Sequence, residues 1–211
     1  WMFAGSSIAG WKSINESDMK LMPDLDSGYL DPFYSEKTYC LHCNVVEPES
    51  GKLYGRDPRS TAVKAEEYLK KTKIGTKAFF GPEAEFFLFD DVKFSNSMNK
   101  VGFEVDAVDA SWNTDTSYEM GNMGHRPGVK GGYFPVNPTD AGQDIRSEML
   151  STMKRMGMKV DKHHHEVASC QHELGLVFDS LKTQGDNLQK YKYVIQNVAH
   201  SYGKSATFMP K

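Results

Sequence analysis

Three stretches of the chain repeat apolar residues with the period of a helix, and shorter alternating stretches between them predict strands. The first helix begins after Asp57, which we expect to cap it, has Pro58 in its first turn and ends at Gly75. Thr139 and Asp140 have the side chains of capping residues and predict the start of the second helix. The apolar face of this second helix consists of Ile145, Met149, Met153 and Met156.

The last helix and the predicted strands complete a mixed pattern. The apolar face of the last helix consists of Leu188, Tyr191, Ile195, Val198 and Tyr202, and the helix closes at Gly203. Strand-forming residues are concentrated in residues 38–46, 77–90 and 92–108 and around residues 163–173. Within 92–108 the polar residues 95–97 predict the turn of a hairpin, and 113–132 reads as a long glycine-rich loop. This order predicts an α+β fold dominated by sheet.

A change of pattern near residue 55 predicts two domains. The loop at residues 47–51 ends a strand-rich region, and a helix cap follows at Asp57, so we place the domains at residues 1–55 and 56–211. The chain opens on Trp1 and closes on the apolar stretch ATFMPK, whereas domain ends are usually polar. We therefore expect it to be part of a longer polypeptide.

The composition is that of an ordinary globular protein, with 25% charged and 39% hydrophobic residues. A net charge of −3 gives no reason to expect nucleic acid or an anionic membrane as partner, and no apolar stretch is long enough to span a bilayer. Three cysteines fit a reducing cytoplasm. Cys40 and Cys43 have CxxC spacing without a second pair, which favours two reduced strand cysteines over a zinc site.

The stretch HHHEVASCQHE, residues 163–173, is the strongest candidate for chemistry. Side chains two apart on a strand share a face, so Glu166 shares a face with His164 and Ala168. Glu173 begins a further strand, so the two strands supply two candidate carboxylates. Glu83 and Glu85 have the same spacing in GPEAEFF; an edge strand with its polar face in water would explain that pair equally well. Four clustered carboxylates suit Mg²⁺ or Mn²⁺ better than zinc.

A second candidate is the glycine-rich sequence GNMGHRPGVKGGYFP, residues 121–135. Its glycines, with His125, Arg126 and Lys130, would allow a backbone to approach phosphates. No GK[ST] sequence follows, so it is not a P-loop, and turn chemistry explains the glycines equally well.

Taken together, these segments resemble the type I glutamine synthetases of bacteria over essentially the whole chain. The motifs that carry the resemblance are, in order, FAGSSIAGW, INESDMKLMPD, DPF, RDPRS, FGPEAEFFLFD, GHRPGVKGGYFP, QDIRSEM, HHHEVA, YKYVIQNVAH and GKSATFMPK. The resemblance implies a partial β-grasp domain followed by the first part of a catalytic domain, a curved antiparallel sheet with flanking helices.

The resemblance also implies an activity and its partners. Members of the family phosphorylate glutamate with ATP, and ammonium then displaces the phosphate from γ-glutamyl phosphate. Two divalent ions, Mg²⁺ or Mn²⁺, serve each site. The subunits form a homododecamer of two stacked hexameric rings, in which the N-terminal domain of one subunit closes the site of the next. Trp11 is a candidate for that contact, and packing within its own domain is the alternative.

Site residues are carried over from the matching motifs. Glu85, Glu166 and Glu173 resemble the ligands of the ion nearer glutamate and ammonium, and Glu83 resembles a ligand of the ion that serves ATP. The motifs further imply that Asp161 and Phe178 contact the nucleotide, that Tyr133 lies near the ammonium end, and that Asp18 is the second acid of the N-terminal segment.

Several positions depart from the family pattern. Ala4 replaces an aspartate that would bind ammonium and accept its proton, and an alanine can do neither. Asp161 stands where a glutamate is common, and its shorter side chain weakens that expected contact. The further ligands of the second ion and the arginines that bind substrate lie beyond Lys211 in the family. Two alternatives follow: a non-catalytic fragment or subunit that binds a divalent ion weakly, and a ligase that joins glutamate to a larger amine, which Ala4 favours.

Overall fold

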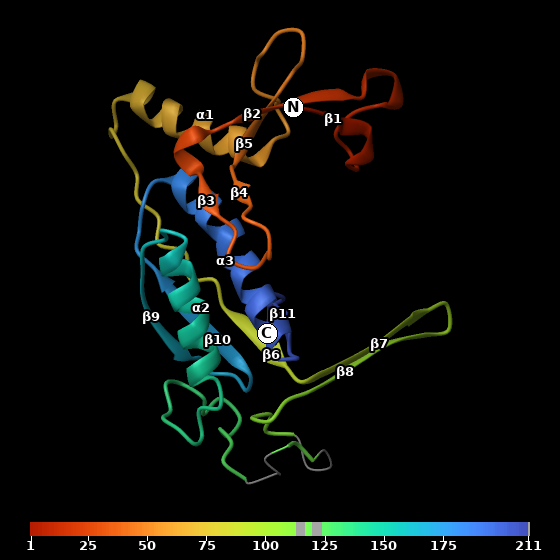
Figure 1. Ribbon diagram of the computed structural model, residues 1–211, viewed down its shortest axis with the longest axis vertical. Coiled ribbons are helices and arrows are strands. Elements are labelled where there is room, and N and C mark those ends of the chain that lie inside the picture. The colour runs from red at the N-terminus through yellow and green to blue at the C-terminus, as the bar shows by residue number, and fades with distance from the viewer. Residues whose placement is uncertain (113–116, 120–123, 211) are drawn as a thin grey trace. The chain divides into compact units, whose positions relative to one another are not determined.

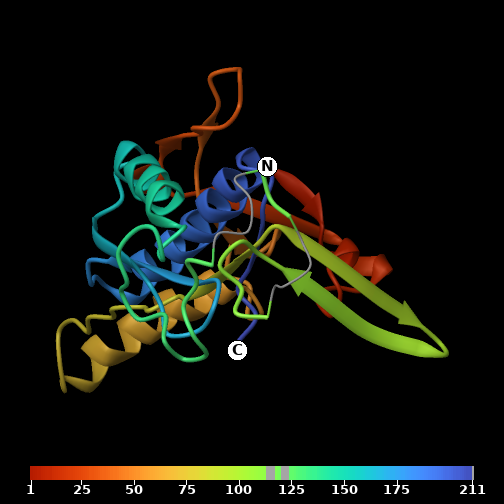
Figure 2. The ribbon, with the colours of Figure 1, turned by 90° about the horizontal axis from the view of Figure 1, so that it is seen from below.

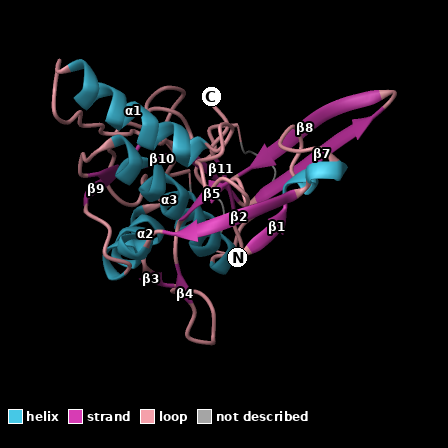
Figure 3. Cartoon of the chain, turned by 90° about the horizontal axis from the view of Figure 1, so that it is seen from above, coloured by secondary structure: helices cyan, strands magenta, loops and turns pink. Residues whose placement is uncertain are grey.

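The chain folds as a mixture of helices and antiparallel sheets, as its pattern predicts (Figure 3). A computed structural model describes residues 1–112, 117–119 and 124–210. It contains two compact units, one of residues 1–81 and 178–189 and the other of residues 82–177 and 190–211. The predicted loop at 113–132 lies partly outside the described residues. Within the described part, no helix is both long and apolar enough to cross a membrane.

The first unit contains two small sheets and one complete helix. A three-stranded sheet has the order β1-β2-β5, and β3 pairs with β4. The elements are β1 (Met2–Ala4), β2 (Asp18–Pro23), β3 (Tyr29–Leu30), β4 (Tyr39–Cys40), β5 (Cys43–Val46), α1 (Pro58–Thr72) and the short 3-10 turns Gly5–Ser7, Ile14–Glu16 and Leu25–Ser27. The predicted strand at 38–46 is therefore divided in two. Met19, Val45 and Tyr54 form the core of this unit, and Trp11 packs against them.

Helix α1 begins as predicted. The Asp57 carboxylate accepts hydrogen bonds from the backbone N–H groups of Arg59 (3.2 Å) and Ser60 (3.0 Å), which satisfies two donors of the first turn. The prediction that Gly75 closes the helix is wrong. Lys73 takes the left-handed position instead, with φ of 59°, and its N–H bonds the carbonyl of Lys70.

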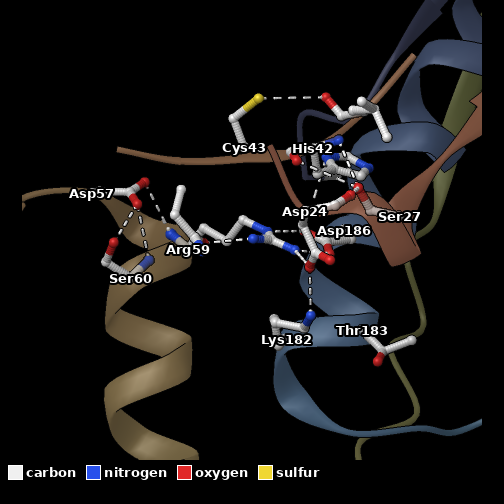
Figure 4. A network of polar contacts seen from close by, with 12 residues as sticks. Asp24, Ser27, His42, Cys43, Asp57, Arg59, Ser60, Lys182, Thr183 and Asp186 are labelled. Carbon is white, nitrogen blue, oxygen red and sulfur yellow. Dashed lines mark hydrogen bonds and ion pairs between the residues drawn. The ribbon is translucent and has the colours of Figure 1, made fainter. Parts of the chain in front are cut away.

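A polar network in the first unit is centred on Arg59 (Figure 4). Its guanidinium donates to both carboxylate oxygens of Asp186, at 2.8 and 2.9 Å, and to Oδ2 of Asp24 at 2.5 Å. Lys182 donates to the same Asp24 oxygen at 2.7 Å. The two cations therefore match the two carboxylates, and the network joins the residue that follows β2, helix α1 and the first turns of α3.

The second unit is built on a four-stranded sheet of order β11-β6-β10-β9, with β7 and β8 as a separate hairpin. The elements are β6 (Phe86–Phe89), β7 (Asp91–Ser97), β8 (Lys100–Asp106), α2 (Gln143–Arg155), β9 (Val160–His165), β10 (Gln171–Leu176), α3 (Leu181–Ser201) and β11 (Ser205–Thr207). Helix α3 begins earlier than its apolar pattern suggests, so its first turns belong to the first unit. In Figure 1, β10 lies between β9 and β6, and α2 runs along β9.

Helices cover one face of this sheet. Phe86 of β6 and Leu174 of β10 are fully buried with the predicted apolar face of α2. Ile145, Met149, Met153 and Met156 are all buried, as are Tyr191, Ile195 and Val198 of α3. The predicted face of α2 is therefore confirmed as a core face, and so is that of α3 at Tyr191, Ile195 and Val198. Of the other residues predicted for the α3 face, Leu188 is only partly buried and Tyr202 is 45% exposed.

Three further predicted boundaries differ from the structure. Within 77–90 only Phe86–Phe89 forms a strand, because Gly81 and Pro82 interrupt the preceding stretch and proline has no N–H to donate. The hairpin turns at 98–99 rather than 95–97. Helix α2 begins after Gly142 rather than Asp140, whose carboxylate accepts a hydrogen bond from the Gly142 N–H (3.0 Å) and binds Arg146.

The hairpin β7–β8 is a two-stranded ribbon separate from the four-stranded sheet (Figures 1 and 2). One of its faces carries exposed apolar side chains. Phe94 and Phe103 are directly paired, and both side chains are about 80% exposed, at 81% and 80%. The neighbouring pair of Val92 and Val105 lies on the same side of the ribbon, because alternate residues of a strand share a face. Exposed apolar groups arranged in this way are typical of a surface that contacts another chain.

Candidate metal centre

Strands β9 and β10 bring two of the predicted carboxylates together. Glu173 pairs with His164 across the two strands, and Glu166 follows the end of β9 directly. The Nε2 atom of His164 lies 2.7 Å from Oε1 of Glu166 and 3.9 Å from Oε2 of Glu173. One donor atom from each of the three residues lies within 4.8 Å of the other two, which is close enough to bind one ion.

Glu85 approaches the same place from the neighbouring strand. It precedes β6, and its Oε2 accepts a hydrogen bond of 2.6 Å from the side-chain amide of Gln171 on β10. Glu83 is exposed two residues earlier. Both carboxylates act electrostatically on Glu173, so the structure gathers the four predicted acids in one region. Their role as metal ligands stays a prediction.

The charges of this region are not balanced. Burial raises the pKa of Glu173; His164 lowers it, and the negative charges of Glu166, Glu83 and Glu85 raise it further. Glu166 and Glu173 are both only 8% exposed, so water screens their repulsion poorly. A cation between them would relieve this repulsion. Carboxylate oxygens are the ligands that Mg²⁺ and Mn²⁺ prefer, so this donor set fits a hard divalent ion.

The other two histidines of the run point elsewhere. The ring of His163 lies against α2, with Nδ1 accepting from Arg146 (3.3 Å) and Nε2 3.1 Å from the Ser147 hydroxyl. His165 is fully buried, with Nε2 2.8 Å from Asp109 and Nδ1 near the carbonyls of Gly132 (2.8 Å) and Glu166 (2.7 Å). All these partners of His165 are oxygens, so both ring nitrogens donate. Although burial lowers the pKa of His165, the bond to Asp109 outweighs it and raises the pKa.

A second group of potential ligands, Asp109, His165 and His172, is a structural network. These donor atoms also lie close together. However, Nδ1 of His172 lies 2.9 Å from the Arg146 guanidinium, which already supplies a positive charge. Burial, followed by the charge of Arg146, lowers the pKa of His172 to about 3. A neutral His172 and the ion pair of Asp109 with His165 leave no net negative charge to attract a metal.

Tyr133 lies beside the carboxylates. Its ring centre is 5.6 Å from that of His164 in an edge-to-face arrangement, and the side chain is 57% exposed. Its segment is tied to the β9–β10 connection, because the Gly132 N–H donates to Val167 (3.0 Å) and the Phe134 N–H to His165 (2.9 Å). The Tyr133 ring is therefore held next to His164 of the cluster.

The remaining predicted residues lie apart from this cluster along the chain. Asp161 is exposed at the start of β9 and packs on Gly175, where an added Cβ would lie 2.2 Å from Asp161 Oδ1. Phe178 belongs to the first unit; it is 62% exposed, with its ring centre 5.4 Å from that of Phe79. Asp18 and Ala4 also belong to the first unit and are paired partners on β2 and β1.

Two residues that organise the cluster, Gln171 and Tyr191, are not among the predicted site residues. Gln171 holds Glu85, and its position two residues before Glu173 on a strand was a usable signal, since such residues share a face. Tyr191 was predicted only as part of an apolar helix face. Its hydroxyl is nevertheless hydrogen-bonded to both carboxylate-bearing segments.

Comparison with known families identifies the fold. The family model of the glutamine synthetase catalytic domain matches residues 55–211, and that of the glutamine synthetase beta-Grasp domain matches residues 1–48. The chain therefore belongs to the glutamine synthetase family. The predicted resemblance and fold class are confirmed.

Individual relatives agree with this family. The chain is 68% identical over its 211 residues to a glutamine synthetase of Cereibacter sphaeroides and to one of Rhodobacter capsulatus, and covers 45% and 48% of those proteins. A Plasmodium falciparum glutamine synthetase structure matches the whole chain with a TM-score of 0.90 and 28% identity, over 41% of its length. A structure described as a GmaS/ADP complex has a TM-score of 0.70 at 21% identity and shows likeness of fold alone. The chain spans about half the length of the curated relatives that it matches.

Proposed function

We propose that this protein is an ATP-dependent ligase that forms glutamine from glutamate and ammonium. The observation that carries the proposal is the group of buried and half-buried carboxylates around His164 in a chain of the glutamine synthetase family. Phosphoryl transfer requires neutralisation and alignment of phosphate charge more than covalent help, and a carboxylate site for divalent ions supplies that chemistry.

The residues of this chain have distinct parts in the proposal. Glu85, Glu166 and Glu173 would hold one Mg²⁺ or Mn²⁺ ion, and Glu83 would contribute to a second. When bound, these ions would neutralise the transferred phosphate. Tyr133, exposed beside His164, would line the site where ammonium and glutamate bind.

The nucleotide and ammonium contacts are supported by motif and exposure. Phe178 exposes an aromatic face on which an adenine can stack, and Asp161 is solvent-accessible. Asp18 would act in catalysis as the second acid of the N-terminal segment. Its paired partner is Ala4, which brings no carboxylate to that position.

Ala4 supports a second candidate, a ligase for a larger amine. A methyl group in place of an acid removes one site for the ammonium charge and leaves more space. If the enzyme forms glutamine, the rate of product formation with ammonium should be far higher than that with methylamine. If it is a ligase for a larger amine, the rate with methylamine should be the higher one.

The decisive experiment measures glutamine formation by the purified full-length protein from glutamate, ammonium, ATP and Mg²⁺. Glu173→Gln should lower the rate at least 100-fold, because it removes a charged ligand. Glu104→Gln, the same change on the exposed ribbon, is the matched control and should retain the rate. No product with either amine would favour the non-catalytic alternative, and an intact mass near 23.7 kDa would agree with it.

The proposal includes assembly with further copies of the chain. The exposed apolar ribbon face around Phe94 and Phe103 supports contact with another subunit. A homododecamer of two hexameric rings is the assembly proposed from the family resemblance. Sedimentation of a Phe94→Ser, Phe103→Ser double variant should then show smaller particles than those of the unchanged protein.

A further inference from the structure

Strands β6 and β10 separate at the position of the candidate ligands. Their antiparallel ladder is regular at one end, where the Leu88 N–H donates to the Cys170 carbonyl at 3.0 Å. Pairing continues through Phe87 and Gln171 to Phe86 and His172, and stops there. The carboxylates of Glu85 and Glu173 belong to the next pair of residues in this register.

A side-chain hydroxyl occupies the place of the next ladder bond. In antiparallel strands the hydrogen-bonded pairs alternate, so the pair after Leu88–Cys170 and Phe86–His172 is Ala84–Leu174. The Leu174 N–H does not reach the Ala84 carbonyl directly. It donates instead to the Tyr191 hydroxyl at 3.1 Å, and this hydroxyl donates to the Ala84 carbonyl at 2.7 Å.

Tyr191 is held firmly in this position. The residue is 0% exposed on α3, and its ring packs on Phe86 and Phe208 with centre distances of 6.4 and 6.1 Å. Burial raises the pKa of the phenol, so the hydroxyl keeps the proton that it donates to Ala84. A buried tyrosine with both a donor and an acceptor partner is fully satisfied.

The inserted oxygen changes the spacing of the carboxylates. Without it, Glu85 and Glu173 would form the narrow, non-hydrogen-bonded pair of the ladder, with Cα atoms only about 4.5 Å apart. Two like charges directly opposite in a sheet repel each other. The Tyr191 hydroxyl lies between Leu174 and Ala84 and so makes the connection between the two strands longer than a direct ladder bond. The side-chain amide of Gln171 donates to the Glu85 carboxylate and holds it in place.

We propose that Tyr191 is a positioning residue for the metal centre, a spacer whose hydroxyl holds β6 and β10 apart so that Glu85 and Glu173 can coordinate a divalent ion between them. This inference rests on the proposed function, because it assigns to Tyr191 the geometry of the same carboxylates. Tyr191 itself touches neither ion nor substrate.

Mn²⁺ binding to the full-length protein tests the proposal, with free Mn²⁺ counted by electron paramagnetic resonance. Tyr191→Phe removes one oxygen and keeps the packed ring. We expect its dissociation constant for Mn²⁺ to rise at least 10-fold, which is the effect typical of losing a hydrogen bond that positions metal ligands. Tyr202→Phe is the matched control; it removes a hydroxyl that donates to Glu148 (2.6 Å), away from the ligand segments, and should leave the constant unchanged.

The outcomes separate the two proposals. Tight Mn²⁺ binding by the unchanged protein with the same constant in Tyr191→Phe would overturn the spacer role and leave the proposed function intact. An unchanged protein that binds no Mn²⁺ would overturn both. Should Tyr191→Phe fail to fold, a structure of the unchanged protein with Mn²⁺ decides: the hydroxyl must remain bonded to both Ala84 and Leu174, and direct closure of the ladder would refute the spacer.

Discussion

An aspartate and an arginine lie near the start of both α1 and α2, and the two aspartate–arginine pairs make different contacts. In α1, Asp57 caps the helix, and Arg59 is free to bind Asp186 and Asp24. In α2, the corresponding acid is bound by the helix's own arginine; Arg146 donates to both oxygens of Asp140, at 2.9 and 2.5 Å. The Asp140 carboxylate is thus engaged by Arg146 and does not cap α2, whereas that of Asp57 is available to cap α1.

The two arginines also have different surroundings. Arg59 lies among carboxylates and close to a second cation, Lys182, with a side chain 10% exposed. Arg146 is only 1% exposed and has one carboxylate and two histidine rings as partners. Burial makes each unpaired charge more costly, and Arg146 is the more buried of the two and has only one carboxylate partner. Loss of Arg146 should therefore lower the free energy of unfolding more than loss of Arg59.

The largest effect should follow from Arg146→Met. The change leaves the Asp140 carboxylate, 4% exposed, without its cation, which typically costs about 3–5 kcal/mol of unfolding free energy. Urea unfolding followed by circular dichroism measures it. Lys154→Met on the exposed side of α2 is the control, with an expected change in unfolding free energy below about 0.5 kcal/mol. Equal losses in the two variants would contradict the assigned role of Arg146.

Arg59→Met should lower the free energy of unfolding by less, about 2–3 kcal/mol, because Lys182 still neutralises Asp24. Hydrogen bonds from Lys182 and Arg59 hold the pKa of Asp24 well below its ordinary value of 3.8. A lowered folded-state pKa contributes stability that is present above the ordinary value and is lost as the pH falls below it. Unfolding of both proteins from pH 7 to pH 2 should therefore show the difference shrinking below about pH 4. A constant difference would exclude this linkage.

Asp57→Ala should lower the free energy of unfolding by a smaller amount, about 1–2 kcal/mol. The change removes the cap of α1 but does not leave a buried cation without its carboxylate. The carboxylate also accepts from the Val45 N–H at 3.3 Å, which places the value toward the upper end. Asp57→Asn retains an accepting oxygen and should recover most of the loss. Thermal unfolding of the three proteins gives the comparison, and an alanine variant as stable as the unchanged protein would show that the cap is dispensable.

Local chemistry explains which parts of the fold could be predicted. The cap at Asp57, the hairpin and the apolar faces of α2 and α3 depend on neighbours within a few residues, and all are found in the structure. The start of α2 depends on a partner outside its capping sequence. Asp140 is drawn to Arg146, which in turn contacts His172, and a propensity argument cannot include such a contact.

The candidate site shows the same division. Strand period placed Glu166 and Glu173 on neighbouring strands, and the structure gathers them at His164. The inserted Tyr191 hydroxyl could not be predicted from spacing, since it requires the register between strands far apart in the sequence. Spacing indicates that Gln171 shares a face with Glu173, but the bond from its amide to Glu85 depends on that same register.

The smallest expected effect concerns charge that is not balanced by an arginine. Arg59 and Arg146 each neutralise nearby acids, whereas Glu173 is buried beside Glu166 and its pKa is raised by burial and by that repulsion. Glu173→Gln should therefore stabilise the metal-free protein, by up to about 1 kcal/mol, as relief of a strained functional group often does. Millimolar Mn²⁺ should raise the melting temperature of the unchanged protein and leave that of the variant nearly unaffected, because a bound ion stabilises only the state that binds it. Calorimetry with and without Mn²⁺ measures both effects. A variant less stable than the metal-free parent would mean that Glu173 is satisfied by protein partners, and equal Mn²⁺ shifts would remove it from the proposed ligand set.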